Sequence, residues 1–365
     1  MQNIVTANYL LKGEILNKIE LLALSIAREL SQEKDLPLSL LVNSKDNYIL
    51  NDSGILHCGK KKKEKTLLSK KSKQLSNKYV KLWIVINYIH MVVTSDKEVT
   101  LREAYYFLKT FFSNQSEFSK RLVDIMGLFE CQRECLGIIG SSSGAIAGLV
   151  QWIEPGLYCD CSNTSLGGKR LPGSVKEVKF KSLGARYVIV VEKDAIFNLL
   201  CEDSIWEKIP CVIFTGCGYP SLGARKILKK LEEDLSVPFL GLFDYNPHGV
   251  RILFTYRFGS FGLGLETAHY TINIKWMGVH FSDVTDSKAI PQHVWMEWNK
   301  SDHSIHKSNI KTFLPKLSRP AQDELTKMGE VKRKLEIEAI EYLTSIPKYI
   351  LDKILHNDYI QLIDM

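Results

Sequence analysis

Two acidic residues directly follow apolar segments that have the composition of buried β-strands. Glu192 follows the β-branched run at residues 187–191, and Asp244 follows the apolar run at residues 237–243. Parallel strands end at the same edge of a sheet, so these carboxylates are expected to meet there. They would repel each other unless a cation lies between them, and oxygen ligands favour Mg²⁺ or Mn²⁺. The pattern predicts a metal site for phosphoryl transfer, with Asn246 lending a neutral oxygen; the alternative is that both acids cap helices or pair with a lysine.

A second candidate for chemistry lies on a helix that is expected to begin at Thr100. Thr100 and Glu103 have the spacing of a capping box, in which the hydroxyl and the carboxylate bond reciprocally to backbone amides. At about 100° per residue, the core face of this helix is predicted to carry Leu101, Tyr105, Leu108 and Phe112.

The same geometry leaves Tyr106 outside the core, on one flank with Arg102 and Lys109. A phenol one turn from a guanidinium is suited to attack on phosphate, because Arg102 can neutralise the phosphoryl oxygens while Lys109 adds attraction. The alternative is a surface tyrosine that stacks on an arginine.

Phosphate-binding glycine loops are missing from the sequence. Residues 167–170 read Gly-Gly-Lys-Arg and lack the leading glycine and the Ser/Thr of a Walker A loop, and Gly216-Cys-Gly218 is followed by Tyr-Pro-Ser. The chain is therefore not expected to be an ATPase or a dinucleotide enzyme.

Length and composition indicate a globular protein of two or three domains, with 365 residues, 45% hydrophobic and 24% charged. The formal net charge is +7, and eight lysines with one glutamate between residues 60 and 73 account for all of it. Such a run is typical of a solvated linker, a nuclear address or a phosphate-contacting arm.

The eight cysteines form no CxxC pair, so reduced thiols and a cytosolic or nuclear location are expected. The longest apolar stretch, residues 80–93, is too short and too polar to cross a bilayer, and neither a secretory signal nor a transit peptide is expected.

The elements divide into a helical part and an alternating part. Helical spacing is found at residues 15–30, 79–93 and 117–130, and a polar stretch at 44–77 is expected to be a linker or long loop. The first helix either packs on its own domain or docks a partner. Residues 135–139 and 145–150 are predicted to form a hairpin, which with the preceding helices suggests a winged-helix unit; the alternative is an ordinary small helical domain.

The alternating part runs strand, helix, strand, helix, strand, helix. The strands are predicted at residues 187–191, 211–215 and 237–243, and the helices at 194–200, 225–231 and from 250 onward. This order predicts a parallel sheet covered by helices.

Seven short motifs occur in an order that resembles one family. They are Leu101-Arg-Glu-Ala-Tyr-Tyr106, Val191-Glu-Lys-Asp-Ala195, Thr215-Gly-Cys-Gly-Tyr-Pro220, Asp244-Tyr-Asn-Pro-His-Gly249, Tyr256-Arg-Phe-Gly-Ser260, Lys275-Trp-Met-Gly278 and Lys334-Leu-Glu-Ile-Glu-Ala339. From about residue 75 to residue 354 the chain resembles the A subunit of DNA topoisomerase VI and, more closely, its eukaryotic relative that makes meiotic double-strand breaks.

The resemblance implies an α/β plus α+β fold in three parts: a partner-docking helix and basic linker at 1–76, a winged-helix domain with the nucleophilic tyrosine at 77–165, and a Toprim domain at 175–365. It implies that Tyr106 forms a 5′-phosphotyrosyl link to double-stranded DNA, assisted by Arg102, and that Glu192, Asp244 and Asn246 hold Mg²⁺ or Mn²⁺.

The implied assembly is a nuclear homodimer in which the tyrosine of one protomer works with the metal of the other. ATP would be used only by a topoisomerase VI B-like partner that docks on the N-terminal helix. The candidate DNA contacts are Lys120, Arg121 and Arg133 around the expected recognition helix, together with Lys109 on the helix of Tyr106. Two alternatives stay open: the A subunit of a strand-passing topoisomerase VI, and a catalytically weak DNA-bound scaffold.

The sequence departs from the family pattern at four positions. Glu103 replaces an aspartate, Asn246 replaces the second acid of an Asp-x-Asp motif, Ser143 replaces a lysine of the wing, and Ser221 replaces an aspartate. These changes bear on the strength of metal and DNA binding and leave Tyr106 as the expected nucleophile.

Overall fold

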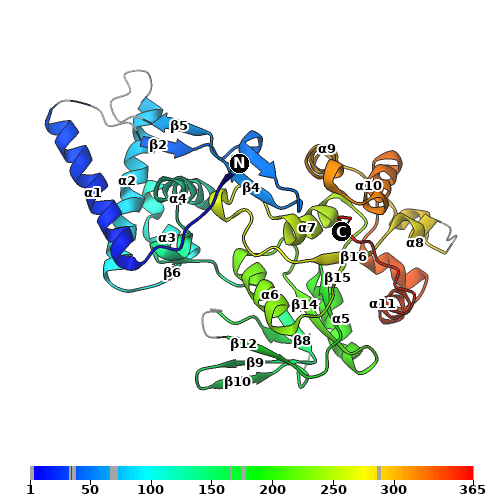
Figure 1. The fold of residues 1–365 in the computed structure, drawn as a ribbon. Helices are drawn as coiled ribbons and strands as arrows, with labels where there is room; N and C mark the ends of the chain where they lie inside the picture. Colours follow the sequence, from blue (N-terminus) through cyan, green and yellow to red (C-terminus); the bar gives the residue numbers. More distant parts are fainter. Residues whose placement is uncertain are drawn as a thin grey trace. The chain divides into compact units, whose positions relative to one another are not determined.

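The computed structural model describes residues 4–32, 34, 38–65, 73–164, 167–173, 178–285 and 289–364, which form two compact units (Figure 1). The first unit holds residues 1–51, 56–141 and 260–269, and the second holds residues 52–55, 142–259 and 270–365. None of the described helices combines the length and the apolar character that crossing a membrane requires.

The core of the first unit is built by helices α1 (Lys12–Ser31), α2 (Lys73–Thr94), α3 (Leu101–Phe107) and α4 (Gln115–Phe129). Apolar residues at helical spacing face inward from them, among them Ile15, Ile19, Ile89 and Phe118. The predicted helices at 15–30, 79–93 and 117–130 are therefore confirmed, and burial of their apolar faces is what holds this unit together.

Short strands complete the first unit, and they show that one prediction was wrong. The stretch at 44–77, expected to be a linker, holds β3 (Tyr48–Leu50), β4 (Leu56–Gly59) and β5 (Lys62–Lys65). β4 pairs with β3 and with β1 (Ile4–Val5), and β5 pairs antiparallel with β2 (Leu38–Leu41). Part of the lysine run is thus strand, because its backbone pairs with the apolar segment at 38–41; residues 66–72 lie outside the described residues.

The predicted hairpin between residues 135–139 and 145–150 is wrong. Strand β7 (Ile138–Ile139) pairs parallel with β6 (Val99–Thr100), and β8 (Ala145–Gly148) pairs antiparallel with β14 (Cys211–Thr215), within the second unit. All four residues of β8 are buried, so this small apolar strand gains more from a place inside a large sheet than from a two-stranded wing. A winged-helix domain at 77–165 remains a prediction.

A six-stranded sheet is the centre of the second unit, in the order β11-β8-β14-β13-β15-β16. The strands β13 (Tyr187–Val191), β14 (Cys211–Thr215), β15 (Phe239–Leu242) and β16 (Ile274–Gly278) are parallel, whereas β8 and β11 (Lys169–Arg170) extend the sheet antiparallel. The predicted parallel sheet is confirmed, and its strands are almost wholly buried, as strands covered on both faces must be.

The strand order creates a crevice at one point of this sheet. The chain passes from β13 sideways to β14, then back across β13 to β15, and onward to β16. Right-handed crossovers therefore put α5 (Asp194–Glu202) on one face and α6 (Leu222–Leu235) and α7 (Pro247–Phe258) on the other, and Figure 1 shows α5 and α6 on either side of the strands. The segments after β13 and β15 diverge, which opens the position between their carboxyl ends to a ligand.

The remaining elements surround this sheet. A three-stranded antiparallel sheet contains β9 (Val150–Glu154), β10 (Leu157–Asp160) and β12 (Lys179–Ser182). The C-terminal part contains α8 (Phe281–Thr285), β17 (Met296–Glu297), α9 (Lys300–Phe313), α10 (Arg319–Val331), β18 (Arg333–Lys334), the 3₁₀ helix η8 (Ile337–Tyr342) and α11 (Ile346–Leu355).

Candidate metal site and candidate nucleophile

Glu192 and Asp244 meet at the carboxyl ends of β13 and β15, as the sequence predicts. Val191 is in register with Leu242, and the backbone amide of Glu192 donates to the carbonyl of Leu242 at 3.1 Å. The amide of Asp244 then donates to Glu192 Oε2 at 2.9 Å. Both residues are buried, with exposed fractions of 9% for Glu192 and 4% for Asp244. The carboxyl ends of the two strands therefore bring two buried carboxylates together.

Asn246 and Gly249 shape the loop beside these acids. Asn246 is the N-cap of α7: its Oδ1 accepts from the amide of Gly249 at 2.7 Å, and its Nδ2 lies 3.5 Å from Asp244 Oδ2. A Cβ on Gly249 would lie 2.4 Å from the Asp244 carbonyl and 3.0 Å from Glu192 Oε2. Only glycine allows this close approach, while one lone pair of the Asn246 oxygen is already used by the cap.

Lys193 contacts Asp244 and two glutamates of the last motif. Its Nζ lies 3.3 Å from Asp244 Oδ1, 3.2 Å from Glu336 Oε2 and 2.6 Å from Glu338 Oε2. The amide of Ile337, between the two glutamates, donates to Asp244 Oδ1 at 2.9 Å. The segment 334–339 therefore contacts the Asp244 carboxylate directly through the Ile337 amide and indirectly through Lys193.

The electrostatics of the pair favour binding of a cation. Burial, and then the charge of Asp244, raise the pKa of Glu192 well above its ordinary value. Burial also raises the pKa of Asp244, although the charge of Lys193 and the Ile337 amide oppose that rise. For Lys193, burial acts to lower the pKa, but the bond to Glu338 and the charge of Asp244 outweigh it and raise that pKa.

A divalent ion fits this donor set. Within the described part of the chain, no set of three or more His, Cys, Asp or Glu side chains is arranged as a metal centre, so the candidate consists of the Glu192 and Asp244 carboxylates, with Asn246 next to them and its amide oxygen bonded to the Gly249 amide. Mg²⁺ is ordinarily held by one or two carboxylates together with water and substrate phosphate, which is what two converging carboxylates in a crevice provide.

The candidate nucleophile is on the surface of the first unit. Helix α3 begins with the predicted capping box, since Thr100 Oγ1 accepts from the amide of Glu103 at 3.2 Å and Glu103 Oε2 accepts from the amide of Thr100 at 2.6 Å. Tyr106 is 59% exposed, and Arg102, one turn earlier, is exposed as well. Tyr105 is half-buried and belongs to the core face, with its ring centroid 5.5 Å from that of Tyr106.

The four candidate DNA contacts separate into two kinds. Lys109 and Lys120 are exposed, and Lys120 lines a cavity of about 260 Å³ with Lys63. Arg121 is buried beside Asp124, with 2.8 Å between Nη1 and Oδ2. Arg133 is buried as well, and its Nε and its backbone amide both donate to Glu266, which is 2% exposed.

Arg121 and Arg133 therefore act within the first unit, as ion-pair partners. A guanidinium that is buried against a carboxylate would have to lose that partner to reach a phosphate, so DNA contact by these two arginines stays a prediction. Sequence spacing alone did not show this, since Glu266 is 133 residues from Arg133.

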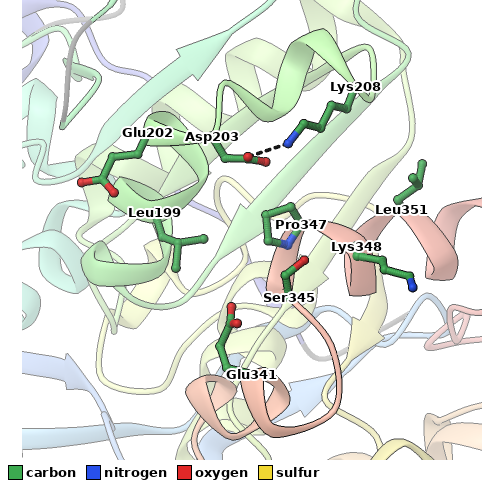
Figure 2. A pocket seen from close by; sticks show the side chains of 9 residues that line it. All are labelled: Leu199, Glu202, Asp203, Lys208, Glu341, Ser345, Pro347, Lys348 and Leu351. Carbon is green, nitrogen blue, oxygen red and sulfur yellow. Dashed lines mark hydrogen bonds and ion pairs between the residues drawn. The ribbon is translucent and has the colours of Figure 1, made fainter.

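A separate cavity of about 540 Å³ lies in the second unit and contains none of the predicted site residues (Figure 2). Its wall includes Leu199, Pro347 and Leu351, and the ion pair between Asp203 and Lys208. Variants of residues at this cavity can serve as controls for variants of the metal site, because both lie in the second unit.

Family models match both units of the chain. The model of the type IIB DNA topoisomerases matches residues 77–138, and the model of the Toprim domain shared by Spo11 and the A subunit of topoisomerase 6 matches residues 187–357. Glu192 and Asp244 both lie in the Toprim match, and Toprim domains in general bind divalent metal ions.

Relatives of known name agree with these matches. "Meiotic recombination protein SPO11-2" of Oryza sativa subsp. japonica is 37% identical over 294 residues, which cover 77% of this chain and 74% of the relative. The protein of the same name from Arabidopsis thaliana is 33% identical over 98% of this chain and 96% of its own. The A subunit of DNA topoisomerase 6 from Arabidopsis thaliana is 29% identical over 76% of this chain and 65% of its own. The chain belongs to the family of Spo11 and the topoisomerase 6 A subunits.

Sequence reasoning missed Lys193, Glu336 and Glu338 as members of the site. All three stand in motifs that the resemblance uses, Val191-Glu-Lys-Asp-Ala195 and Lys334-Leu-Glu-Ile-Glu-Ala339, so the signal was present. Their proximity in space could not be read from the sequence, because it depends on η8 packing beside the end of β15.

The raised pKa of Glu192 predicts a pH dependence of stability. A carboxyl whose pKa is higher in the folded than in the unfolded state keeps a proton that the unfolded chain releases, so stability falls as pH rises above about 4.5. Without divalent cations, the melting temperature of the wild type should therefore fall more steeply between about pH 5 and about pH 8 than that of Glu192→Gln. Thermal denaturation at a series of pH values measures this, with Glu202→Gln on α5 as the control; parallel curves for wild type and Glu192→Gln would contradict it.

The buried pair of Arg133 and Glu266 predicts a large stability effect. Removing one partner leaves an uncompensated buried charge, so Arg133→Met or Glu266→Gln should lower the free energy of unfolding by about 3–5 kcal/mol. The control is Lys12→Met, which removes an exposed pair with Asp96 and should cost less than about 1 kcal/mol. Urea unfolding measures both, and equal losses for the buried and the exposed pair would refute the structural role of Arg133.

Proposed function

We propose that this protein is a DNA-cleaving transesterase of the type IIB topoisomerase class, which makes meiotic double-strand breaks in the nucleus. The observation that carries the proposal is the exposed Tyr106 phenol beside Arg102 on a capped helix, in a chain that also buries two converging carboxylates. The names of its relatives support the meiotic role, since the two "Meiotic recombination protein SPO11-2" chains are more similar to it than the topoisomerase 6 protein of Arabidopsis.

The reaction is an exchange of one phosphodiester for another. The Tyr106 oxygen attacks the phosphorus and loses its proton to solvent, a Tyr–O–P bond forms at the 5′ side, and the 3′ oxygen of the broken P–O bond leaves and takes up a proton. Arg102 binds the phosphoryl oxygens as their charge grows, and Lys109 draws the backbone toward the helix. The two ester bonds are similar in energy, so the cleavage step needs no ATP.

The acidic site would hold Mg²⁺ or Mn²⁺ through Glu192, Asp244 and Asn246. A bound divalent ion would supply positive charge that stabilises the scissile phosphate and the leaving oxygen. Glu192 and Asp244 would bind the ion and orient it, while the Gly249 turn keeps the loop close to both acids. In the active complex, a homodimer, the Tyr106 of one protomer would work with the acids of the other.

The N-terminal helix is the surface proposed for a topoisomerase VI B-like partner. Ile15, Ile19 and Ile26 of α1 are buried in the first unit, so one side of the helix packs on its own unit, as one of the two predictions stated. Leu21 and Leu24 are 55% and 65% exposed, and they offer an apolar patch on a different side of α1. The helix is therefore able to pack on its own unit and dock a partner.

Two other functions are alternatives that the adduct assay described below can distinguish from the proposed one. The A subunit of a strand-passing topoisomerase VI is supported by the relatives that carry that name. A catalytically weak DNA-bound scaffold is supported by Asn246, whose amide replaces a charged ligand and whose oxygen already caps α7.

The test of the proposed reaction concerns the nucleophile. The protein, its B-like partner, Mn²⁺ and end-labelled DNA should give an adduct that survives denaturant, and Tyr106→Phe should abolish it because the attacking oxygen is lost. Tyr105→Phe is the matched control, since Tyr105 is the neighbouring phenol on the buried side, and it should retain the adduct.

The outcomes of this assay separate the three functions. An adduct that persists in Tyr106→Phe would refute the assigned nucleophile, and no adduct with any divalent metal would select the scaffold. ATP-dependent relaxation of supercoiled DNA would select the strand-passing enzyme.

A further prediction concerns the exposed lysines. If Lys109 and Lys120 each neutralise one phosphate, replacing both with Gln should reduce the slope of log K against log salt by about 2. Lys12→Gln with Lys208→Gln is the charge-matched control, because both of those lysines pair with carboxylates. Filter binding or fluorescence anisotropy at several salt concentrations measures the slope, and equal slopes for the two double variants would remove the exposed lysines from the interface.

A further inference from the structure

Lys193 is held by three carboxylates at once. Its ammonium has three N–H donors, and three acceptors lie within 3.3 Å of Nζ, on Asp244, Glu336 and Glu338. The side chain of Asp244 is 6% exposed, whereas those of Glu336 and Glu338 are 55% and 46% exposed. Lys193 therefore lies at the boundary between the buried metal-site acid and two acids that face solvent.

The first consequence concerns how the acid pair is tolerated. Glu192 and Asp244 are buried next to each other, and two buried carboxylates repel. Lys193 is the cation that contacts Asp244 among the described residues. Its ammonium thus stabilises the negative charge of the buried Asp244 when no metal is bound.

The second consequence concerns what happens to Lys193 when a metal is bound. Because position 246 is asparagine, the pair carries two negative charges, and one divalent ion neutralises them. An ammonium 3.3 Å from Asp244 would then be in excess and would be repelled by the ion. Glu336 and Glu338 let it withdraw while it keeps two of its three ion pairs.

We propose that Lys193 is the internal counter-cation of the Glu192–Asp244 pair, and that it passes from Asp244 to Glu336 and Glu338 when a divalent cation binds. This inference rests on the proposed metal site and adds to it a residue that competes with the ion for Asp244. Lys193 is a positioning residue here: it acts on the site through Asp244.

Competition of this kind has a direct signature in metal affinity. Removing the ammonium removes a positive charge that competes with the ion for Asp244, so Lys193→Met should tighten Mn²⁺ binding about tenfold or more. Replacing Glu336 and Glu338 with Gln should weaken Mn²⁺ binding about tenfold, because Lys193 then loses its other carboxylate partners and stays at Asp244. In the Lys193→Met background the same two replacements should have a clearly smaller effect.

The experiment measures Mn²⁺ binding by the full chain, without DNA, from the loss of the electron paramagnetic resonance signal of the free ion. The variants are Lys193→Met, Glu336→Gln/Glu338→Gln, and all three changes together, which complete a thermodynamic cycle. Lys208→Met is the matched control, since Lys208 pairs with Asp203 at the cavity of Figure 2, and it should bind Mn²⁺ as the wild type does. Glu336 and Glu338 are half-exposed, so their variants test the inference even if Lys193→Met folds poorly.

The outcomes separate this inference from the proposed function. Tighter binding by Lys193→Met, with a non-additive cycle, supports it. Wild-type binding that Glu192→Gln abolishes, together with unchanged or weaker binding by Lys193→Met or an additive cycle, would overturn the role of Lys193 and leave the metal site standing. Wild-type binding that is absent or insensitive to Glu192→Gln would overturn the metal site and this inference with it.

Discussion

The second unit has to accommodate two carboxylates that are buried side by side at the end of a parallel sheet. Glu192 and Asp244 are both buried, and the amide of one bonds to the carboxylate of the other. Charges of the same sign in such a place are tolerated only with compensation. The compensation comes from the Ile337 amide and Lys193, and the second unit uses a C-terminal segment, η8 with the residues before it, to hold both in place.

The sheet topology explains why the two acids meet where they do. Because β13 lies between the two strands that follow it in the chain, its loop and that of β15 turn to opposite faces and leave a crevice between them. Glycine at 249 lets the first turn of α7 pack against Asp244 and Glu192, and Asn246 caps that turn. In the first unit the task is simpler, since a seven-residue helix with a capping box only has to present Tyr106 and Arg102 to solvent.

Local patterns made much of this predictable. The capping box at Thr100, the outward position of Tyr106 and the alternation of strands and helices follow from spacing within a few residues. Two predictions failed where the partners are distant in sequence: β8 joined the large sheet instead of a hairpin, and Lys62–Lys65 became a strand paired with residues 38–41. Pairing of this kind depends on which surfaces are available after collapse, and no spacing rule reports that.

The sequence by itself determined the strands, the acids that end them, and the face of the helix on which Tyr106 lies, because side-chain periodicity and hydrogen-bonding capacity are local properties. Tertiary structure alone decided that Lys193 bridges Asp244 to Glu336 and Glu338, since Ile337, which lies between those glutamates, is 93 residues from Asp244. Ion pairs between distant segments form only once the backbone has brought their charges within a few ångströms, because Coulomb attraction in water is too weak to specify them earlier.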